Sequence, residues 1–423
     1  MLIALNVFSR GIASLGGFLL SLIVAQIAGA EGLGPFAVFL SVLGILSIIA
    51  RRGQDRLVTR AVAWMDHKAE EGTAVALLLF AASRALFPAI TLGLIGSLLL
   101  ASGWLGSAFP GTIVVMPLAL LAITLLALVA GYAKGVSRAW IAPLFEIGGI
   151  SLLATLILAC MVLTGNAVPE VSITIALLAA LLFLLILVAG FMIWRDMPGR
   201  KRLPLLDADQ REEIRTGQVD FTLIALATYL TQAGSFVLAA PLLSGTDLGL
   251  LRAAERLAFL VSFPVLAINP VISPRIVRLS RGRDADGLRR LTKNAVLTSA
   301  GLSACFLLPL LIWPERALAL MGADFTDAVS YLRLMAAAHF LSALIGPLAV
   351  LMNMSGRERS SMWINLTTLA IAIPLVPGLS MMLGASGFAV AYSAVIIARN
   401  ALIAAAVFRG RSNLKNSYVS RTW

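Results

Sequence analysis

The sequence predicts an all-α integral membrane protein, with about 12 transmembrane helices in two six-helix lobes around a central cavity. Three observations predict this fold. First, 60% of the 423 residues are hydrophobic and 13% are charged, and the mean hydropathy is +0.95, beyond what the surface of a water-soluble domain tolerates. Second, apolar stretches of about 20 residues, enough to cross ~30 Å of hydrocarbon, recur along the chain. Third, the Lys and Arg residues gather in alternate loops.

Each crossing is predicted to be an α-helix, because lipid offers no hydrogen-bond partner to backbone N–H and C=O groups. The first crossing is not a cleavable signal sequence, since Arg10 lies within it and a second crossing follows closely. In chain order, the predicted crossings are residues 6–28, 35–50, 73–101, 112–133, 141–163, 172–194, 219–240, 249–273, 294–313, 330–353, 361–382 and 387–408.

The distribution of basic residues predicts the orientation. On this topology 26 of the 33 Lys and Arg residues lie in one set of loops, and only Arg316 lies in the opposite set. Short loops rich in Lys and Arg stay in the cytoplasm, so both termini are predicted to be cytoplasmic. The net charge of +12 then faces the anionic cytoplasmic leaflet, and no nucleic-acid partner is expected.

The longest polar linker predicts the domain organisation. It separates an N-terminal lobe, residues 1–200, from a C-terminal lobe, residues 218–423, and residues 201–217 form a cytoplasmic linker. The two lobes have a similar layout near their starts, where a short outer loop with an acidic residue and a glycine precedes an apolar helix: Glu31 and Gly34 in the first lobe, Asp247 and Gly249 in the second. Two such six-helix halves are predicted to be parallel repeats that rock about a central site. Duplicated bundles without transport activity are the alternative.

Arginines within the predicted crossings are the candidate functional residues. A charge at the bilayer centre costs on the order of 3 kcal/mol, so depth decides which of them are informative. Those near a helix end extend to the headgroups, whereas the deep ones are expected to face a cavity or a buried partner. The first group is Arg10, Arg252 and Arg333, and the second is Arg84, Arg256 and Arg399.

The stretch "LLRAAERLAF" holds three charges within five residues, Arg252, Glu255 and Arg256. Arg252 and Arg256 lie one turn apart on one helical face, and Glu255 is three residues from Arg252. Because one carboxylate does not neutralise two guanidiniums, the surplus charge suits a cavity that receives an anion such as phosphate. The alternative is a structural salt bridge that locks this helix to a neighbour.

No constellation typical of an enzyme is present. His67 and His339 are far apart in sequence and lack neighbouring metal-type ligands, and no phosphate-binding loop occurs. Cys160 and Cys305 lie within predicted helices, where cysteine behaves as a small hydrophobic residue. The sequence therefore argues against an enzyme, with no catalytic residue, no metal site and no cofactor expected.

Two segments carry a resemblance to a known family. The stretch "FSRGIASLGGFLLSLIVAQIAGAEGLGPFAVFLSVLGILSIIARRGQDRLVTRAVA" and the stretch "LGLLRAAERLAFLVSFPVLAINPVISPRIVRLSRGRD" resemble the polysaccharide-export (O-antigen or Wzx-type) flippases of the multidrug/oligosaccharidyl-lipid/polysaccharide (MOP) flippase superfamily. The resemblance implies two six-helix lobes around a cavity. It also implies a multi-pass protein of the bacterial cytoplasmic (inner) membrane that moves an undecaprenyl-diphosphate-linked oligosaccharide to the periplasmic leaflet for cell-surface polysaccharide biosynthesis.

The resemblance also suggests site residues. In the lipid II flippases of the same superfamily, cavity arginines hold the diphosphate; Ser9 and Arg10 are similar to their helix 1 pair, and Glu255, Arg256 and Leu257 to their helix 8 triplet. Gly16 and Gly17 replace a second charged pair of those flippases, which makes lipid II a less favoured cargo. The candidate diphosphate and cavity residues are Arg256, Arg84, Arg399, Arg10, Arg252 and Glu255.

The expected partners are the lipid-linked oligosaccharide, membrane lipids and other polysaccharide-assembly proteins. A cation-coupled multidrug exporter of the same superfamily is the competing transporter, and it would need an excess of cavity carboxylates. A membrane glycan polymerase or ligase, or a scaffold without transport activity, is the alternative from another class.

Overall fold

The computed structural model confirms the all-α prediction, since every regular element in the residues it describes is a helix. The predicted linker, residues 201–217, lies outside these residues, as does His67. The described residues are 2–64, 71–136, 138, 140–164, 168–195, 218–282, 284–354 and 358–417.

Every predicted crossing coincides with a helical segment. Within the described residues, 8 helices are long and apolar enough to cross a membrane. Two of them, Leu15–Arg51 and Arg359–Phe408, each contain two predicted crossings. The remaining two predicted crossings correspond to the shorter apolar helix Ile147–Leu163 and to an interrupted helical segment at residues 218–239.

Contacts between residues divide the chain into two compact units, Met1–Gly249 and Leu250–Trp423. The boundary lies inside helix α10, and the preceding helices α8 and α9 pack against α1 in the first unit. The predicted lobes, residues 1–200 and 218–423, stay a prediction.

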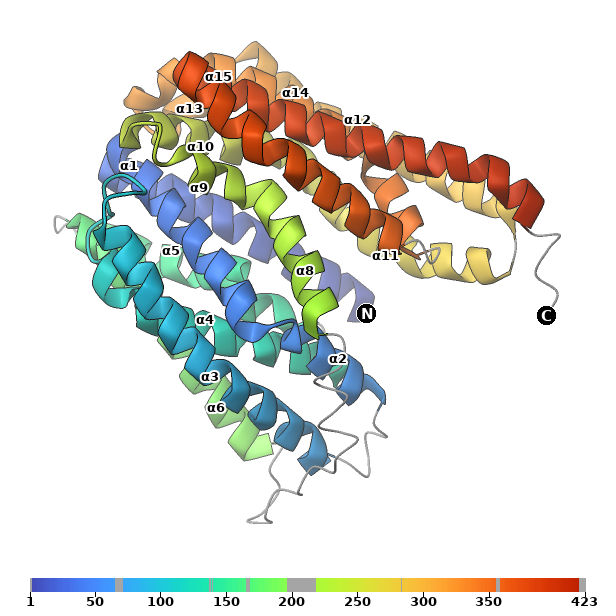
Figure 1. Ribbon diagram of the computed structural model, residues 1–423, viewed down its shortest axis with the longest axis horizontal. Coiled ribbons are helices and arrows are strands. Elements are labelled where there is room, and N and C mark those ends of the chain that lie inside the picture. Colours follow the sequence, from blue (N-terminus) through green and yellow to red (C-terminus); the bar gives the residue numbers. More distant parts are fainter. Residues whose placement is uncertain are drawn as a thin grey trace. The chain divides into compact units, whose positions relative to one another are not determined.

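The first unit is built around the long helix α1 (Figure 1). Its elements are α1 (Leu2–Arg51), α2 (Gln54–Trp64), α3 (Glu71–Ala101), α4 (Thr112–Gly135), the 3-10 turn η1 (Ala142–Phe145), α5 (Ile147–Leu163), α6 (Glu170–Arg195), α8 (Gln218–Tyr229), the π-helical turn η2 (Leu230–Gly234), α9 (Ser235–Ala239) and the start of α10 (Gly245–Phe259).

Helix α1 contains two legs joined at Gly29. Gly29 has φ +62° and ψ −166°, a conformation open to glycine but costly for residues with a Cβ. The expected outer loop before residue 35 is therefore reduced to this one residue, and Glu31 and Gly34 belong to the second leg. Asp247 and Gly249, expected in the corresponding loop of the second half, likewise lie in the first turns of α10.

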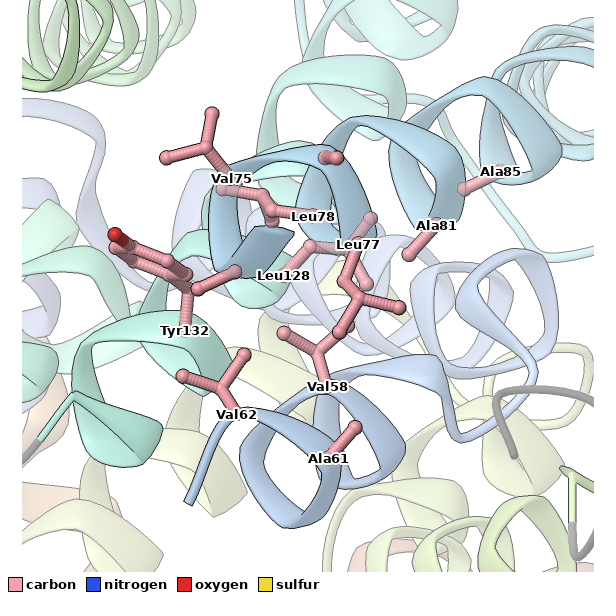
Figure 2. Packing of buried hydrophobic residues seen from close by; sticks show 12 residues of the cluster. Val58, Ala61, Val62, Val75, Leu77, Leu78, Ala81, Ala85, Leu128 and Tyr132 are labelled. Carbon is pink, nitrogen blue, oxygen red and sulfur yellow. The ribbon is translucent and has the colours of Figure 1, made fainter. Parts of the chain in front are cut away.

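A core of aliphatic residues joins α2, α3 and α4 (Figure 2). Val58 and Val62 of α2 face Leu77 and Ala81 of α3, and Leu128 of α4 completes the contact. Val58, Leu77, Ala81 and Leu128 are fully buried. Small residues on α3 bring the helix backbones close together, as is usual where helices pack inside a bilayer.

The second unit has two core clusters, one between α14 and the two legs of α15 and one between α11 and α12. Helix α15 contains two legs joined at Gly384, which has φ +60°, and Figure 1 shows them in orange-red and red. The elements are the rest of α10, the 3-10 turn η3 (Leu260–Ser262), α11 (Phe263–Arg281), α12 (Ala285–Ile312), α13 (Pro314–Ala319), the 3-10 turn η4 (Ala323–Ala328), α14 (Val329–Met354) and α15 (Glu358–Ser417).

Proline interrupts the predicted eighth crossing. The α-helical hydrogen bonds of α10 end at Phe259, the turn η3 follows, and α11 begins with Pro264 in its first turn. Proline has no N–H to donate, and its fixed φ suits the first turn of a new helix. The crossing is therefore two helices with a break between them.

The outer faces of the long helices are apolar. Phe87 and Leu98 on α3 are 75% and 70% exposed, and Met381 and Met382 on α15 are 73% and 78% exposed. Water-soluble monomers rarely expose contiguous surfaces of this kind. These faces suit contact with lipid acyl chains.

Candidate functional site

A capped helix positions the charged residues of α10. The Asp247 N–H donates a hydrogen bond of 3.1 Å to the Ser244 hydroxyl, which in turn donates one of 2.8 Å to the Asp247 carboxylate. This arrangement satisfies an N–H group that the first turn of a helix otherwise leaves without a partner. The helix then continues into the segment that carries Arg252, Glu255 and Arg256.

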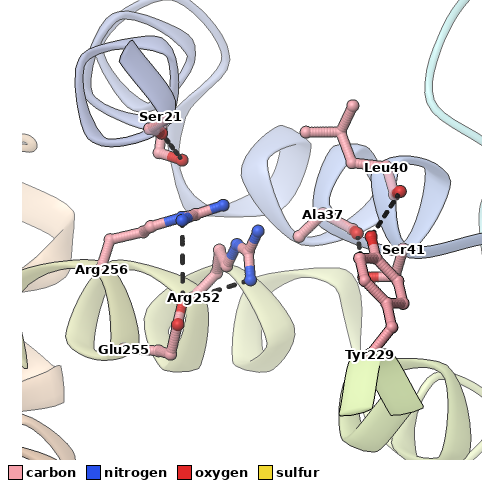
Figure 3. Close-up of polar contacts among 9 residues, drawn as sticks. Ser21, Ala37, Leu40, Ser41, Tyr229, Arg252, Glu255 and Arg256 are labelled. Atoms are coloured by element: carbon pink, nitrogen blue, oxygen red, sulfur yellow. Dashed lines mark hydrogen bonds and ion pairs between the residues drawn. The ribbon is translucent and has the colours of Figure 1, made fainter. Parts of the chain in front are cut away.

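The three charged residues of α10 form one cluster (Figure 3). Arg252 Nη1 lies 3.2 Å from Glu255 Oε2, and Arg256 Nε lies 3.8 Å from the same oxygen. Arg252 and Glu255 are 7% and 8% exposed, so the charges are held largely away from solvent. Both of these ion pairs lie within α10. One carboxylate serves two guanidiniums, as the spacing predicted.

Two further polar residues surround Glu255, and sequence reasoning missed both. The Tyr392 hydroxyl of α15 hydrogen-bonds the Glu255 carboxylate, and His339 of α14 lies close enough for its charge to interact with that of Glu255. His339 Nδ1 lies 3.1 Å from the Ser262 hydroxyl, and its ring packs edge-on against Phe259 at 5.7 Å between centroids. The cluster therefore ties α10 and η3 to α14 and α15.

Arg399 is held by a neutral partner. Its Nε donates a hydrogen bond of 3.0 Å to the Asn365 side-chain oxygen, which joins the two legs of α15. Among the described residues no carboxylate forms an ion pair with Arg399. Arg399 thus places a guanidinium without a carboxylate partner among these residues in a long apolar helix.

Arg84 on α3 also lacks a carboxylate partner within the part of the chain that the structure describes. Its guanidinium lies 5.8 Å from the centre of the Phe80 ring, at the distance of a cation–π contact. Its Nε is buried and makes no hydrogen bond there. The side chain as a whole is partly exposed, and the neighbouring Phe87 is highly exposed.

The remaining candidates are dispersed. Arg10 belongs to the first leg of α1, and its side chain lies outside the described residues. Arg333, expected to extend to the headgroups, is exposed on α14. Within the second unit, Arg399 contacts Asn365 rather than the charges of α10. The structure thus brings together Arg252, Glu255 and Arg256, and the role of all six candidates in holding a substrate stays a prediction.

Comparison with known proteins identifies the fold. No protein-family model matches the sequence, and no curated protein matches it. Among solved structures, an inward-facing multidrug resistance MATE family transporter of the MOP superfamily matches with a TM-score of 0.71. The match covers 99% of this chain and 100% of that one, at 14% identity. The chain has the fold of a MOP-superfamily transporter.

Two further structures support the MOP fold. The MATE multidrug transporter DinF-BH matches with a TM-score of 0.66 at 17% identity, over 97% of this chain and 95% of that one. A MOP-superfamily transporter from Pyrococcus furiosus, whose binding pocket has reverse polarity, matches with a TM-score of 0.63 at 14% identity, over 98% and 96% of the two chains. The resemblance to the O-antigen-type branch of the superfamily stays a prediction.

Close helix packing explains the glycine at residue 16 of α1. A Cβ added to Gly16 on α1 would clash with the carbonyl oxygen of Gly148 and with the backbone and Cβ of Leu152 on α5. The resembling lipid II flippases carry a charged pair in this region. Here α1 and α5 approach too closely for a side chain at residue 16, so the departure from that pattern has a structural reason.

Proposed function

We propose that the chain is a membrane transporter that moves an undecaprenyl-diphosphate-linked oligosaccharide from the cytoplasmic to the periplasmic leaflet by alternating access. The MOP-transporter fold, shared with the solved structures over nearly the whole chain, supports a transporter. The identity of the cargo rests on the charges that the helices carry.

The balance of buried charge is the observation that carries this proposal. Glu255 is shared by two arginines, and within the described residues the neutral Asn365 is the hydrogen-bond partner of Arg399. An ionisable residue at this depth is costly and is usually retained for function. A surplus of guanidinium charge favours an anionic ligand over a cationic one.

Arginine is also the side chain best suited to a diphosphate. Its planar group donates two parallel hydrogen bonds to phosphate oxygens and stays protonated at any physiological pH. In this proposal Arg256 and Arg399, with Arg84 and Arg10, neutralise the diphosphate while the prenyl chain stays in lipid. Other polysaccharide-assembly proteins would supply and remove the cargo.

The MOP fold tolerates different pocket charges. The Pyrococcus furiosus transporter with this fold has a binding pocket of reverse polarity, which suggests a different function for that protein. An arginine-rich member that carries an anionic cargo would be a further variation on the same fold.

Cation-coupled multidrug export is the second candidate. It is favoured by the multidrug transporters that share the fold and by the buried carboxylate of Glu255. The surplus of arginine over carboxylate in the described helices argues for the anionic cargo.

Reconstitution into liposomes tests the proposal. The purified protein is expected to move a fluorescent undecaprenyl-diphosphate oligosaccharide between leaflets, and Arg399→Gln is expected to reduce the rate at least tenfold. Arg333→Gln, which removes an exposed intramembrane arginine, is the matched control and should retain the wild-type rate. Export of cationic dyes without movement of the lipid-linked glycan would replace the proposal with the multidrug alternative.

A further inference from the structure

The first unit contains a partly open cavity of about 320 Å³. Its walls come from the second leg of α1, the start of α2, α4, η1, the start of α5 and the end of α8. Small-molecule sites in proteins occupy roughly 300–1,000 Å³, so the cavity has the size of a small ligand or a lipid headgroup.

Four charged side chains line this cavity, two of each sign. Lys134 Nζ lies 2.6 Å from Glu146 Oε1, and Arg51 Nε lies 3.8 Å from Asp55 Oδ1. Each of them sits where it complements a helix dipole. The cations belong to the last turns of α4 and α1, and the acids stand at the starts of α5 and α2.

Both ion pairs are able to exchange partners. The side chains of Lys134 and Glu146 are 33% and 42% exposed, and those of Arg51 and Asp55 are 20% and 22% exposed. Partly hydrated pairs of this kind contribute little to stability. A ligand with one anionic and one cationic group would therefore give up little when its anionic group contacts the basic residue of one pair and its cationic group contacts the acidic residue of the other.

The rest of the wall is mostly apolar. Ile48, Ile123 and Phe145 line the cavity, together with the side chain of Tyr229. An apolar wall lowers the local dielectric and strengthens the charged contacts that a bound ligand makes. A ligand without charge would leave both ion pairs as they are and gain only the apolar contacts.

We propose that this cavity binds a small zwitterion that carries one primary ammonium group and one phosphate or carboxylate group. The cavity charges sum to zero, so a simple anion meets two carboxylates and a simple cation meets two basic groups. A zwitterion places its anion against Arg51 or Lys134 and its ammonium against Asp55 or Glu146. This inference goes beyond the proposed transport function and does not depend on it.

The cavity lies next to an irregular helical segment, the end of α8 and the turn η2. Tyr229 is the last residue of α8 before the π-helical turn η2, and its hydroxyl donates a hydrogen bond of 3.4 Å to the Leu40 carbonyl of α1 (Figure 3). Such π-helical turns are often found at functional sites. A ligand against Tyr229 therefore acts at the point where the segment α8–α9 loses its regular hydrogen bonds.

Equilibrium dialysis of the full-length protein in detergent tests the proposal, with radiolabelled glycerophosphoethanolamine, whose phosphodiester and ammonium charges balance, as the probe. Saturable binding is expected, with inorganic phosphate and ethanolamine competing at least tenfold more weakly than the unlabelled zwitterion. Glu146→Gln and Arg51→Gln should each weaken binding at least tenfold. Glu315→Gln and Arg316→Gln, which change exposed charges in the other unit, are the matched controls and should bind like the wild type.

A second variant separates binding from folding. Ala127→Leu fills the cavity without altering any charge and should abolish binding while the melting temperature stays near that of the wild type. The proposal is overturned if phosphate alone binds as tightly as the zwitterion, if no saturable binding occurs, or if Ala127→Leu binds normally.

The same assay identifies the source of the ligand. Competition by nanodiscs that contain phosphatidylethanolamine, but not by nanodiscs of phosphatidylglycerol, assigns the cavity to a zwitterionic lipid headgroup. Binding that neither nanodisc displaces assigns it to a soluble zwitterion. Transport of the lipid-linked glycan is not measured, so failure here leaves the proposed cargo untouched.

Discussion

At the scale of single residues, loss of the Glu255 carboxylate is expected to lower the stability of the folded protein. Glu255→Gln removes the negative charge that Arg252 and Arg256 share and leaves two buried guanidiniums beside a neutral amide. Loss of one partner of a buried ion pair costs about 3–5 kcal/mol. We expect a clear fall in the melting temperature of the purified protein in detergent. Glu315→Gln on α13, where the side chain is exposed, should melt like the wild type, and an equally stable Glu255→Gln protein would contradict this account.

The neutral partner of Arg399 leads to a second prediction at this scale. Asn365→Leu removes the hydrogen bond that Arg399 Nε donates to residue 365 between the two legs of α15. A hydrogen bond to a charged group contributes about 1.5–3 kcal/mol to stability. Thermal unfolding should show this loss in Asn365→Leu and a much smaller loss in the double variant Asn365→Leu/Arg399→Leu, which removes both partners. Equal losses in the two proteins would show that the contact carries little energy.

Sequence reasoning located the deep arginines because a charge is conspicuous in an apolar run. It also placed Glu255 within reach of Arg252, since the two residues lie three positions apart on one helix. It missed Tyr392 and His339 because both residues are far from Glu255 in the sequence. Contacts between distant segments cannot be predicted from the spacing of neighbouring residues. The search for metal-ligand spacing passed over His339, whose neighbours are a hydroxyl and aromatic rings.

At the scale of helices, close packing between α1 and α5 predicts the effect of a single methyl group. In Gly16→Ala the added Cβ meets the Gly148 carbonyl oxygen, whereas in Gly301→Ala on α12 it meets no atom within 4 Å. Overpacking of a close contact typically costs about 1–3 kcal/mol, and Gly→Ala at an open helical position is neutral or stabilising by about 0.5–1 kcal/mol. The two variants should therefore shift the melting temperature in opposite directions, and equal shifts would contradict the packing of α1 on α5.

Two glycines of α15 allow the effect of backbone strain on stability to be measured separately from the effect of packing. Gly384 and Gly378 both have open space where a Cβ would be added, but only Gly384 has a positive φ. Gly384→Ala is expected to cost about 1–2 kcal/mol from its left-handed conformation alone, while Gly378→Ala should cost nothing. Thermal unfolding of the two proteins checks this difference, and equal stability would show that the reversal has a different conformation.

The sequence predicted the helices better than their connections. Apolar length is enough to locate each crossing, because lipid imposes the same requirement on every helix. The reversals at Gly29 and Gly384 were expected as loops of several residues, and a single glycine in the left-handed region forms each of them. The eighth crossing was expected as one α-helix, and the structure shows a 3-10 turn before Pro264 at the start of α11.

At the scale of the whole molecule, the asymmetry of basic residues predicts which loops face the cytoplasm. In a chain whose native Cys160 and Cys305 are replaced by serine, Asp324→Cys lies in a predicted periplasmic loop and Asp286→Cys in a predicted cytoplasmic one. A membrane-impermeant maleimide added to intact cells should label the first and not the second. Labelling of the second variant and not the first would show that the orientation is opposite to the predicted one.

The helical fold follows from composition and apolar length, and the solved structures compared above show that it resembles the fold of MOP-superfamily transporters. The resemblance of two sequence segments carried the prediction further, to one branch of that superfamily, and this finer assignment stays a prediction. The identity of the cargo depends on the three-dimensional positions of a few charged side chains, and these positions cannot be predicted from helix periodicity.

The central claim is that the deep arginines hold a diphosphate, and native mass spectrometry tests it most directly. The wild-type protein should retain undecaprenyl diphosphate at least tenfold more strongly than undecaprenyl monophosphate, and Arg399→Gln should lose this preference while Arg333→Gln keeps it. Equal retention of the two lipids by the wild type, or an unchanged preference in Arg399→Gln, would contradict the account.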